Sequence, residues 1–205
     1  MTLTMPLRIV VASQNPDKIL EVEAVLADSG LGIEIVRGLR WPPIEETEDT
    51  LAGNALLKAR TVCAHTGIAA LADDTGLEVD ALGGAPGVRT ARFAGPDASY
   101  DQNVDFLLEA MAGRSDRGAD FRTAVALVTP DGDELVAHGV LRGEIITDRR
   151  GLGGFGYDPV FAVAGRTLAE MGEAEKNRIS HRAMALRALA DLLSSSTSDG
   201  RDPGP

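Results

Sequence analysis

Residues 71–95 read LADDTGLEVDALGGAPGVRTARFAG, and this stretch indicates the fold more directly than any other. The apolar run at residues 68–72 is typical of a buried strand, and two carboxylates, Asp73 and Asp74, follow it at once. Open α/β sheets place their active sites where strands end and polar loops begin. We therefore expect a functional site here, although Asp-Asp-Thr-Gly is also a favourable turn sequence.

Working outward, strand and helix patterns alternate along the chain. The strand-like segments cover residues 7–12, 33–36, 68–72, 121–129 and 134–143. The helix-like segments cover residues 17–27, 50–66, 101–111 and 180–193, with a short helix beginning at Thr167. The turn sequence Pro-Asp-Gly-Asp at residues 130–133 joins the last two strands as a hairpin. This order predicts an α/β fold with a mixed central sheet flanked by helices.

Composition narrows the class of protein. With 205 residues we expect a single domain over residues 1–193 and a disordered tail over residues 194–205, which has few apolar side chains. The net charge of -11 argues against nucleic acid or an anionic membrane as partner. We find no membrane span and no signal peptide, and the lone Cys63, expected to be buried filler, fits a reducing cytoplasm.

A polar turn at residues 13–18 connects the first strand to the first helix. Backbone N–H groups at a helix N-terminus favour anions, so the turn is a candidate phosphate site formed by Ser13, Gln14, Asn15, Pro16, Asp17 and Lys18. An ordinary helix cap is the alternative. Lysine is scarce, with Lys18, Lys58 and Lys176 against 17 arginines, which suggests that these positions need an ammonium group.

Carboxylates supply a candidate metal site. Asp73 and Asp74 point in opposite directions if both continue the strand, so only one can face a given site. Glu45 and Glu46, in an acidic loop, could add an oxygen ligand. Mg²⁺ typically takes one or two carboxylates together with substrate phosphates, so it is the cofactor we expect.

Three further groups could contact a ligand. Asn54 and Lys58 are four residues apart on one helix face, which could also be an ordinary solvated face. In the glycine-rich loop, Phe155 or Tyr157 could stack on a base and Asp158 could accept hydrogen bonds from it, unless the loop only covers the core. Ser180, His181 and Arg182 open the last helix, where a capped helix start is the simpler interpretation.

In order and spacing, these segments resemble the inosine triphosphate pyrophosphatase family, also called the Ham1 or RdgB family, across residues 7–193. The resemblance implies two lobes with a nucleotide cleft between them, a homodimer, and hydrolysis of ITP, dITP and XTP to the monophosphate and pyrophosphate. It implies that Asp74 is the general base and, with Glu45, a metal ligand. It also implies substrate contacts by the turn at residues 13–18 and by Asn54, Lys58, Thr75, Phe155, Gly156, Tyr157, Asp158, Lys176, His181 and Arg182.

The chain departs from the family pattern around the second helix. Where the family reads F-x-E-N-A-x-x-K-A, this chain has LAGNALLKA, so Leu51 replaces an aromatic residue and Gly53 replaces an acid. Glu48 stands where glycine is common. Asn54 and Lys58 are retained, but the changes argue against a metal ligand at position 53.

Two rival interpretations remain from the sequence. A Maf-like nucleotide pyrophosphatase would share the general architecture and prefer other bases. A nucleotide-binding module without catalysis would bind and not hydrolyse, which the intact Glu45 and Asp74 disfavour.

Overall fold

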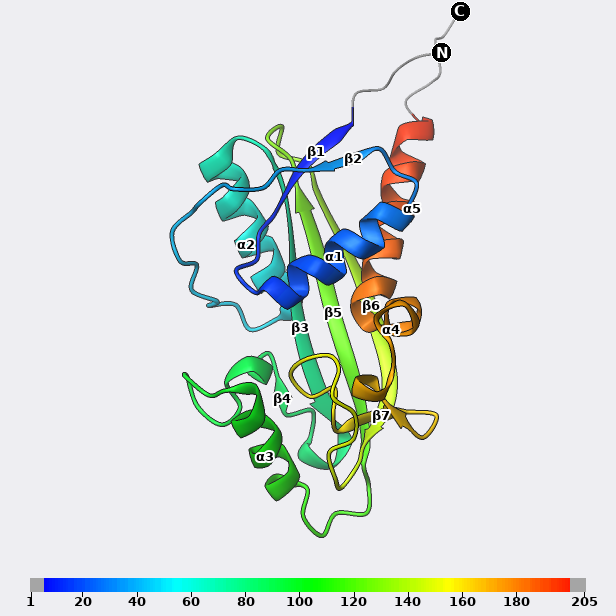
Figure 1. The fold of residues 1–205 in the computed structure, drawn as a ribbon. Coiled ribbons are helices and arrows are strands. Elements are labelled where there is room, and N and C mark those ends of the chain that lie inside the picture. Colours follow the sequence, from blue (N-terminus) through cyan, green and yellow to red (C-terminus); the bar gives the residue numbers. More distant parts are fainter. Residues whose placement is uncertain (1–5, 200–205) are drawn as a thin grey trace, which may run out of the picture. The chain divides into compact units, whose positions relative to one another are not determined.

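The computed structural model describes residues 6–199, with side chains described as far as Ser195. The strands are hydrogen-bonded in the order β2-β1-β3-β5-β6-β7-β8, and β4 pairs with β3 (Figure 1). Their bounds are β1 Leu7–Val11, β2 Ile33–Ile35, β3 Ala69–Val79, β4 Pro86–Gly87, β5 Gly118–Val128, β6 Glu134–Ile145, β7 Phe161–Val163 and β8 Arg166–Thr167. Because β1 pairs in parallel with β2 and β3 whereas β7 pairs antiparallel with β6 and β8, the predicted mixed sheet is confirmed.

The chain divides into two compact units. The first contains the chain up to Asp74, Ala124–Gly139 and the residues from Arg182 onward, and the second contains Thr75–Thr123 and Val140–His181. The helices are α1 Pro16–Asp28, α2 Leu51–Thr66, α3 Tyr100–Ala110, α4 Glu173–Ile179 and α5 His181–Asp199, with three short 3-10 turns at Asp80–Leu82, Thr90–Arg92 and Leu168–Glu170.

Strand alternation separates the first unit into two apolar layers. Ile9, Val11 and Leu71 face one side of the sheet, where they pack with α1 and α5. Val10 and Ala70 face the other side, where they pack with α2. The buried Cys63 belongs to the α2 layer, which confirms its expected place in the core. Up to Asp74, residues on odd positions of β3 therefore face α1 and α5, and residues on even positions face α2.

The prediction that β3 ends before the acid pair was wrong. β3 continues through Asp73, Asp74, Thr75 and Gly76 as far as Val79, so the acids lie in the middle of a strand and not in a turn. Pairing explains the length, because β1 pairs with the first part of β3 and β4 pairs with Leu77 and Glu78. Regular pairing on both sides of the acidic sequence outweighs its turn propensity.

Local sequence signals account for the ends of the helices in the first unit. The side chain of Asn15 caps α1, and Pro16 occupies its first turn. Thr50 caps α2, and Gly67 ends it with a φ of 68°, a left-handed conformation that glycine adopts without steric cost. These helices begin and end within about two residues of the predicted positions.

In the second unit, α3 begins with a capping box between Ser99 and Gln102. Its Phe106 packs edge-on against Phe93, and Phe121 of β5 packs against Phe161 of β7. The short strands β7 and β8 and the seven-residue helix α4 were not predicted, because segments of this length carry too few residues for a periodic pattern.

The last helix is longer than the sequence predicted. α5 extends to Asp199, so the part of the expected disordered tail up to that residue is helical, and residues 200–205 lie outside the described residues. The hydroxyls of Ser194 and Ser195 donate to the carbonyls of Ala190 and Asp191, which satisfies these polar side chains within the helix. Among the helices in the described part of the chain, none is long and apolar enough to cross a membrane.

Candidate functional site

The polar turn before α1 forms a compact cap. The hydroxyl of Ser13 accepts from the N–H of Asn15 at 3.1 Å, and the side-chain oxygen of Asn15 accepts from the N–H of Asp17 at 3.0 Å. The helix-cap interpretation is therefore confirmed for Asn15. It does not conflict with anion binding, because Lys18 in the first turn supplies a positive charge beside the N-terminal end of α1.

Asp73, on the odd-numbered face of β3, lies between two cations. Its Oδ2 is 3.1 Å from Lys18 Nζ and also accepts from Arg182 Nε at 3.1 Å, and its side chain is 1% exposed. The guanidinium of Arg182 also pairs with Glu21 of α1. Burial alone would raise the pKa of Asp73, but Lys18 and Arg182 outweigh it and hold that pKa well below its usual range. The Asp73 carboxylate is therefore ionised at neutral pH, where it pairs with cations from α1 and α5.

Asp74 faces α2 and has different neighbours. Its Oδ1 is 3.0 Å from Lys58 Nζ, and Lys58 in turn lies 2.8 Å from Glu46 Oε1. Burial raises the pKa of Asp74, and the nearby Glu46 carboxylate raises it further, while Lys58 opposes both. The carboxylates of Asp74 and Glu46 raise the pKa of Lys58 despite its burial, so its ammonium form is retained. A buried carboxylate with a raised pKa is suited to accept a proton.

The acidic loop places Glu46, and not Glu45, beside Lys58. Glu45 is exposed. Within the described residues, no group of three His, Cys, Asp or Glu side chains lies close enough to hold a metal ion. Asp74 and Glu46 both approach the Lys58 ammonium, and two such carboxylates are oxygen donors that a divalent cation takes together with phosphate oxygens and water.

Asn54 connects the acidic loop to Asp74. Its side chain accepts from the N–H of Glu48 at 3.0 Å, donates to the carbonyl of Glu48 at 3.1 Å and donates to Asp74 Oδ2 at 3.4 Å. Asn54 is fully buried. These contacts tie the acidic loop to Asp74, and the substrate contact that the resemblance implies for Asn54 stays a prediction.

The two differences from the family pattern near α2, Gly53 and Glu48, lie next to each other in space. A Cβ atom added at Gly53 would lie 2.8 Å from Glu48 Cβ and 2.9 Å from Thr50 Oγ1. The side chain of Glu48 thus fills the space that a side chain at position 53 would need. The family pattern given above has an acid at position 53 and glycine at position 48, which would exchange the position that carries the side chain.

The glycine-rich loop of the second unit is organised around Asp158. Its Oδ2 accepts from the N–H of Phe155 at 2.9 Å and from Lys176 Nζ at 2.5 Å. Lys176 Nζ also lies 4.7 Å from the centre of the Phe155 ring. At Gly154, where φ is 70°, an added Cβ would lie 2.1 Å from Asp158 Oδ2, so the tight approach requires glycine.

Of the two aromatic side chains in this loop, Phe155 is half-buried and Tyr157 is buried. The hydroxyl of Tyr157 donates to the carbonyl of Thr90 at 2.9 Å, and burial raises the pKa of this tyrosine. Tyr157 therefore anchors the loop, and Phe155 is the better candidate to stack on a base. The sequence left both possibilities open.

Thr75 and His181 are joined through a residue that sequence analysis missed. The hydroxyls of Thr75 and Thr123 lie 2.7 Å apart, and Thr123 Oγ1 lies 2.6 Å from His181 Nδ1. The imidazole stacks on Phe121, with ring centres 4.7 Å apart and planes at 23°. Thr123 gave no signal in the sequence, because one threonine in an apolar strand is ordinary. Glu21, the partner of Arg182, was also missed, although its spacing was a signal in the sequence: it lies three residues after Lys18 on the same helix face.

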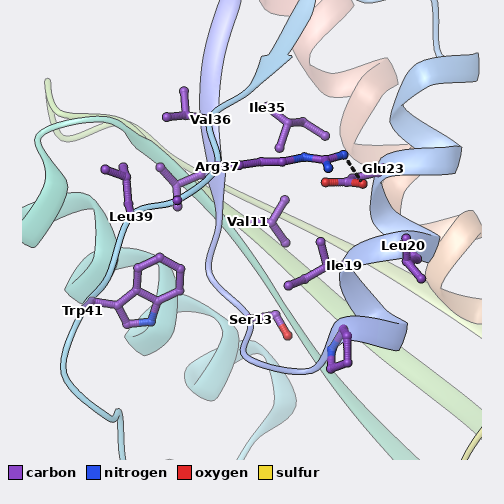
Figure 2. Close-up of a pocket in the computed structure, with 13 residues that line it drawn as sticks. Val11, Ser13, Ile19, Leu20, Glu23, Ile35, Val36, Arg37, Leu39 and Trp41 are labelled. Atoms are coloured by element: carbon purple, nitrogen blue, oxygen red, sulfur yellow. Dashed lines mark hydrogen bonds and ion pairs between the residues drawn. The ribbon is translucent and has the colours of Figure 1, made fainter.

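A separate pocket of about 410 Å³ lies beside the turn in the first unit (Figure 2). Figure 2 shows Val36, Leu39 and Trp41 on one side and Ile19 and Leu20 on the other. Arg37 pairs with Glu23 at 2.6 Å across it. Ser13 and Pro16 contribute to the lining, but Lys18, Asp73 and Asp74 do not. An apolar pocket whose arginine is already paired is unsuited to a triphosphate, so we do not assign the substrate to it.

Both the fold and the sequence of this chain match known proteins. Solved Ham1 proteins share the fold: the structure from Coxiella burnetii is 42% identical with a TM-score of 0.81, and the structure from Staphylococcus aureus is 34% identical with a TM-score of 0.81. Each alignment covers 92% of this chain and 99% of the other. Residues 9–192 match the Ham1 family, and the chain belongs to it. A relative from Methylococcus capsulatus, named dITP/XTP pyrophosphatase, is 47% identical over 91% of this chain and 96% of its own length.

Proposed function

We propose that the protein hydrolyses non-canonical purine nucleoside triphosphates, namely ITP, dITP and XTP, to the monophosphate and pyrophosphate. The observation that carries this proposal is Asp74, a buried carboxylate with a raised pKa held between Lys58 and Asn54 in a chain of the Ham1 family. Removal of such nucleotides protects the nucleotide pool from deaminated bases.

In the proposed reaction, the oxygen of a water molecule attacks the α-phosphorus, and the bond from that phosphorus to the oxygen bridging to the β-phosphorus breaks. Asp74 orients the water and accepts its proton, a role for which its raised pKa is suited. Lys18, Lys58 and the N–H groups at the start of α1 stabilise the charge that develops on the departing pyrophosphate. The same cations offset the net charge of -11 locally.

We assign Glu45 and Asp74 as the residues that would hold Mg²⁺, with Glu46 as a further oxygen donor in the same loop. The ion would supply positive charge against the phosphate oxygens. Asn54 keeps the loop in place through its two hydrogen bonds to the backbone of Glu48. Asp73 acts indirectly: it orders Lys18 and Arg182 and does not take part in proton transfer.

In the second unit, we assign the base to the loop formed by Phe155, Gly156, Tyr157 and Asp158 with Lys176 and His181. Hypoxanthine and xanthine present a 6-oxo acceptor, whereas adenine presents a 6-amino donor. A site with a hydrogen-bond donor at the 6-position binds hypoxanthine and xanthine, whereas adenine leaves that donor unsatisfied. Such a site can discriminate between the two kinds of base by about 10⁴-fold or more in kcat/KM. Arg182 or a backbone N–H near His181 would supply that donor; Arg182 donates to Asp73 and Glu21 through Nε and Nη1, and its guanidinium carries further N–H groups.

A pyrophosphate-release assay with Mg²⁺ tests the proposal. Turnover should be fast with ITP, dITP and XTP and slow with ATP, dTTP and UTP, and ITP should give IMP and pyrophosphate. Preference for dTTP or UTP would favour the Maf-like alternative, and binding without turnover would favour a silent nucleotide-binding module. Release of IDP and orthophosphate would place the attack at the γ-phosphorus and refute the mechanism.

The role of Asp74 has its own test. Asp74→Asn should abolish turnover while circular dichroism and the unfolding transition remain close to those of the wild type, because the amide keeps the shape of the side chain. Substantial residual Mg²⁺-dependent turnover would remove Asp74 as the base. We also expect a cytoplasmic homodimer, and sedimentation analysis of the purified chain checks the oligomeric state.

A further inference from the structure

The pocket of about 410 Å³ in the first unit has no role in the proposed reaction (Figure 2). Two of its lining residues, Val11 and Ile35, are the last residues of the parallel strands β1 and β2. Open α/β sheets bind ligands outside the carboxyl ends of their strands. The volume also lies within the range of pockets that hold small organic molecules, about 300–1,000 Å³. The size and the position of the pocket are therefore those of a ligand site.

The walls of this pocket are apolar and include one aromatic ring. Figure 2 shows Trp41 and Val36 on one side and Ile19 on the other. Leu20 and Leu39 also line the pocket, and they are 64% and 40% exposed. Large apolar side chains that stay uncovered around a concave pocket favour a ligand with a flat apolar body, for which the indole ring of Trp41 is a stacking partner.

A carboxylate, that of Glu23, lines this apolar pocket. Its Oε2 lies 2.6 Å from Nη2 of Arg37, whereas its Oε1 is buried and has no hydrogen-bond partner in the described part of the chain. Buried acceptors in native proteins are paired with donors. The Oε1 atom therefore calls for a donor that the described residues do not supply, and the polar end of a ligand is such a donor.

Arg37 satisfies this carboxylate only in part. Its side chain is 75% exposed, and its contact with Glu23 reaches one of the two carboxylate oxygens. An exposed ion pair of this kind is weak, so the guanidinium can return to water at little cost. A planar amidinium or guanidinium group on a ligand can donate to both carboxylate oxygens at once, which is stronger than a single contact. Because Arg37 reaches Glu23 across the pocket, its departure opens the carboxylate to such a ligand.

We propose that this pocket is a second ligand site, which binds an organic cation with a flat apolar body. The cationic group replaces Arg37 on the carboxylate of Glu23, and the body of the ligand lies against Trp41. The net charge of -11 favours the approach of a cation and opposes an anionic ligand in a pocket lined by a carboxylate. The site is formed by the first unit alone, and the proposal does not rest on the proposed function.

Benzamidine and benzamide are the probes, because they share the ring and only benzamidine carries a positive charge. Trp41 is the only tryptophan of the chain, so its fluorescence reports binding at this pocket. The wild type should bind benzamidine about tenfold more tightly than benzamide, the effect of one charge-assisted contact. Glu23→Gln keeps the shape of the side chain and removes its charge, and it should reduce this preference to less than about twofold.

Arg37→Met should change the affinity in the opposite direction. It removes the group that competes for Glu23, so benzamidine should bind about threefold more tightly than to the wild type, while the affinity for benzamide stays the same. A damaged fold cannot explain such a gain. Glu34→Gln and Arg8→Met are the matched controls, because these two residues form an exposed ion pair at 3.4 Å and do not line the pocket. Both controls should leave the two affinities unchanged.

The titrations decide the proposal. Equal affinities of the wild type for benzamidine and benzamide, or no change in Trp41 fluorescence with excess benzamidine, would overturn it. A preference that survives in Glu23→Gln would place the cation on another carboxylate, and an Arg37→Met variant that binds benzamidine no better would show that the arginine does not compete; each result also overturns the proposal. A wild type that releases no pyrophosphate from ITP would refute the proposed function and leave the test of this pocket unaffected.

Discussion

Replacement of Asp73 by asparagine tests the assignment of this residue as a structural carboxylate. The change removes a buried negative charge that lies 3.1 Å from both Lys18 Nζ and Arg182 Nε. Lys18 can turn toward water, because its side chain is 19% exposed, but the side chain of Arg182 is 3% exposed and keeps only Glu21 as a carboxylate partner among the ion pairs described. Loss of one partner from a buried ion pair costs about 3–5 kcal/mol.

We therefore expect the free energy of unfolding of Asp73→Asn, measured by urea denaturation at pH 7, to fall by about 3–5 kcal/mol. Glu34→Gln is the matched control. Glu34 forms an ion pair with Arg8 at 3.4 Å, and both side chains are more than half exposed. The same carboxylate-to-amide change there should cost less than about 1 kcal/mol.

The contribution of Asp73 to the free energy of unfolding should change with pH in one direction. The pKa of Asp73 is lower in the folded chain than in the unfolded chain, so its contribution is fully present above the unfolded pKa of about 3.9 and is lost as pH falls toward the folded pKa. The stability difference between wild type and Asp73→Asn should be constant from pH 6 to 8 and smaller by about 1 kcal/mol at pH 3. A loss below about 1 kcal/mol at pH 7, or a difference that grows toward pH 3, would refute the reasoning.

Three further contacts are tested by substitution and urea denaturation. Gly53→Ala should cost about 1–3 kcal/mol because of Glu48, and Glu48→Gly in the same chain should recover part of this loss; purely additive effects would contradict the compensation. Gly143→Ala should also cost about 1–3 kcal/mol, because its Cβ would lie 2.5 Å from the carbonyl oxygen of Ala162, and unchanged stability would show that this approach is not tight. Tyr157→Phe should cost about 1 kcal/mol by leaving the carbonyl of Thr90 without this donor, and a neutral effect would mean that water replaces the hydroxyl.

Elements with long periodic patterns could be predicted from the sequence. The continuation of β3 through Asp73 and Asp74 could not, because strand pairing there overrides the local turn propensity. The β1 and α1 boundaries follow from an apolar run and a capped helix start. The acid pair, in contrast, has the local composition of a turn, and the strand continues because β3 pairs with β5 and, at Leu77 and Glu78, with β4. No feature of the sequence near Asp73 announces that pairing.

The candidate site was predictable as a set of residues but not as a set of partners. Both acids and their lysines were singled out from the sequence, yet which lysine belongs to which acid depends on contacts between distant segments. Asp73 pairs with Lys18, 55 residues before it, and Asp74 pairs with Lys58. Thr123 was missed for the same reason, because its role exists only where β5 brings it to His181.

The different behaviour of two adjacent aspartates follows from the geometry of a strand. Successive side chains point to opposite faces, so Asp73 meets the cations of α1 and α5 while Asp74 meets α2 and the acidic loop. Both are buried, and burial alone would raise the pKa of each. For Asp73, Lys18 and Arg182 outweigh burial and lower the pKa. For Asp74, the nearby Lys58 is shared with Glu46, and the pKa stays raised. One short motif thereby yields an acid that stays ionised and holds the site together, and a neighbouring acid that can take a proton. A shift of the strand by one residue would exchange the two roles, so the long, regular β3 is itself a requirement of the proposed chemistry.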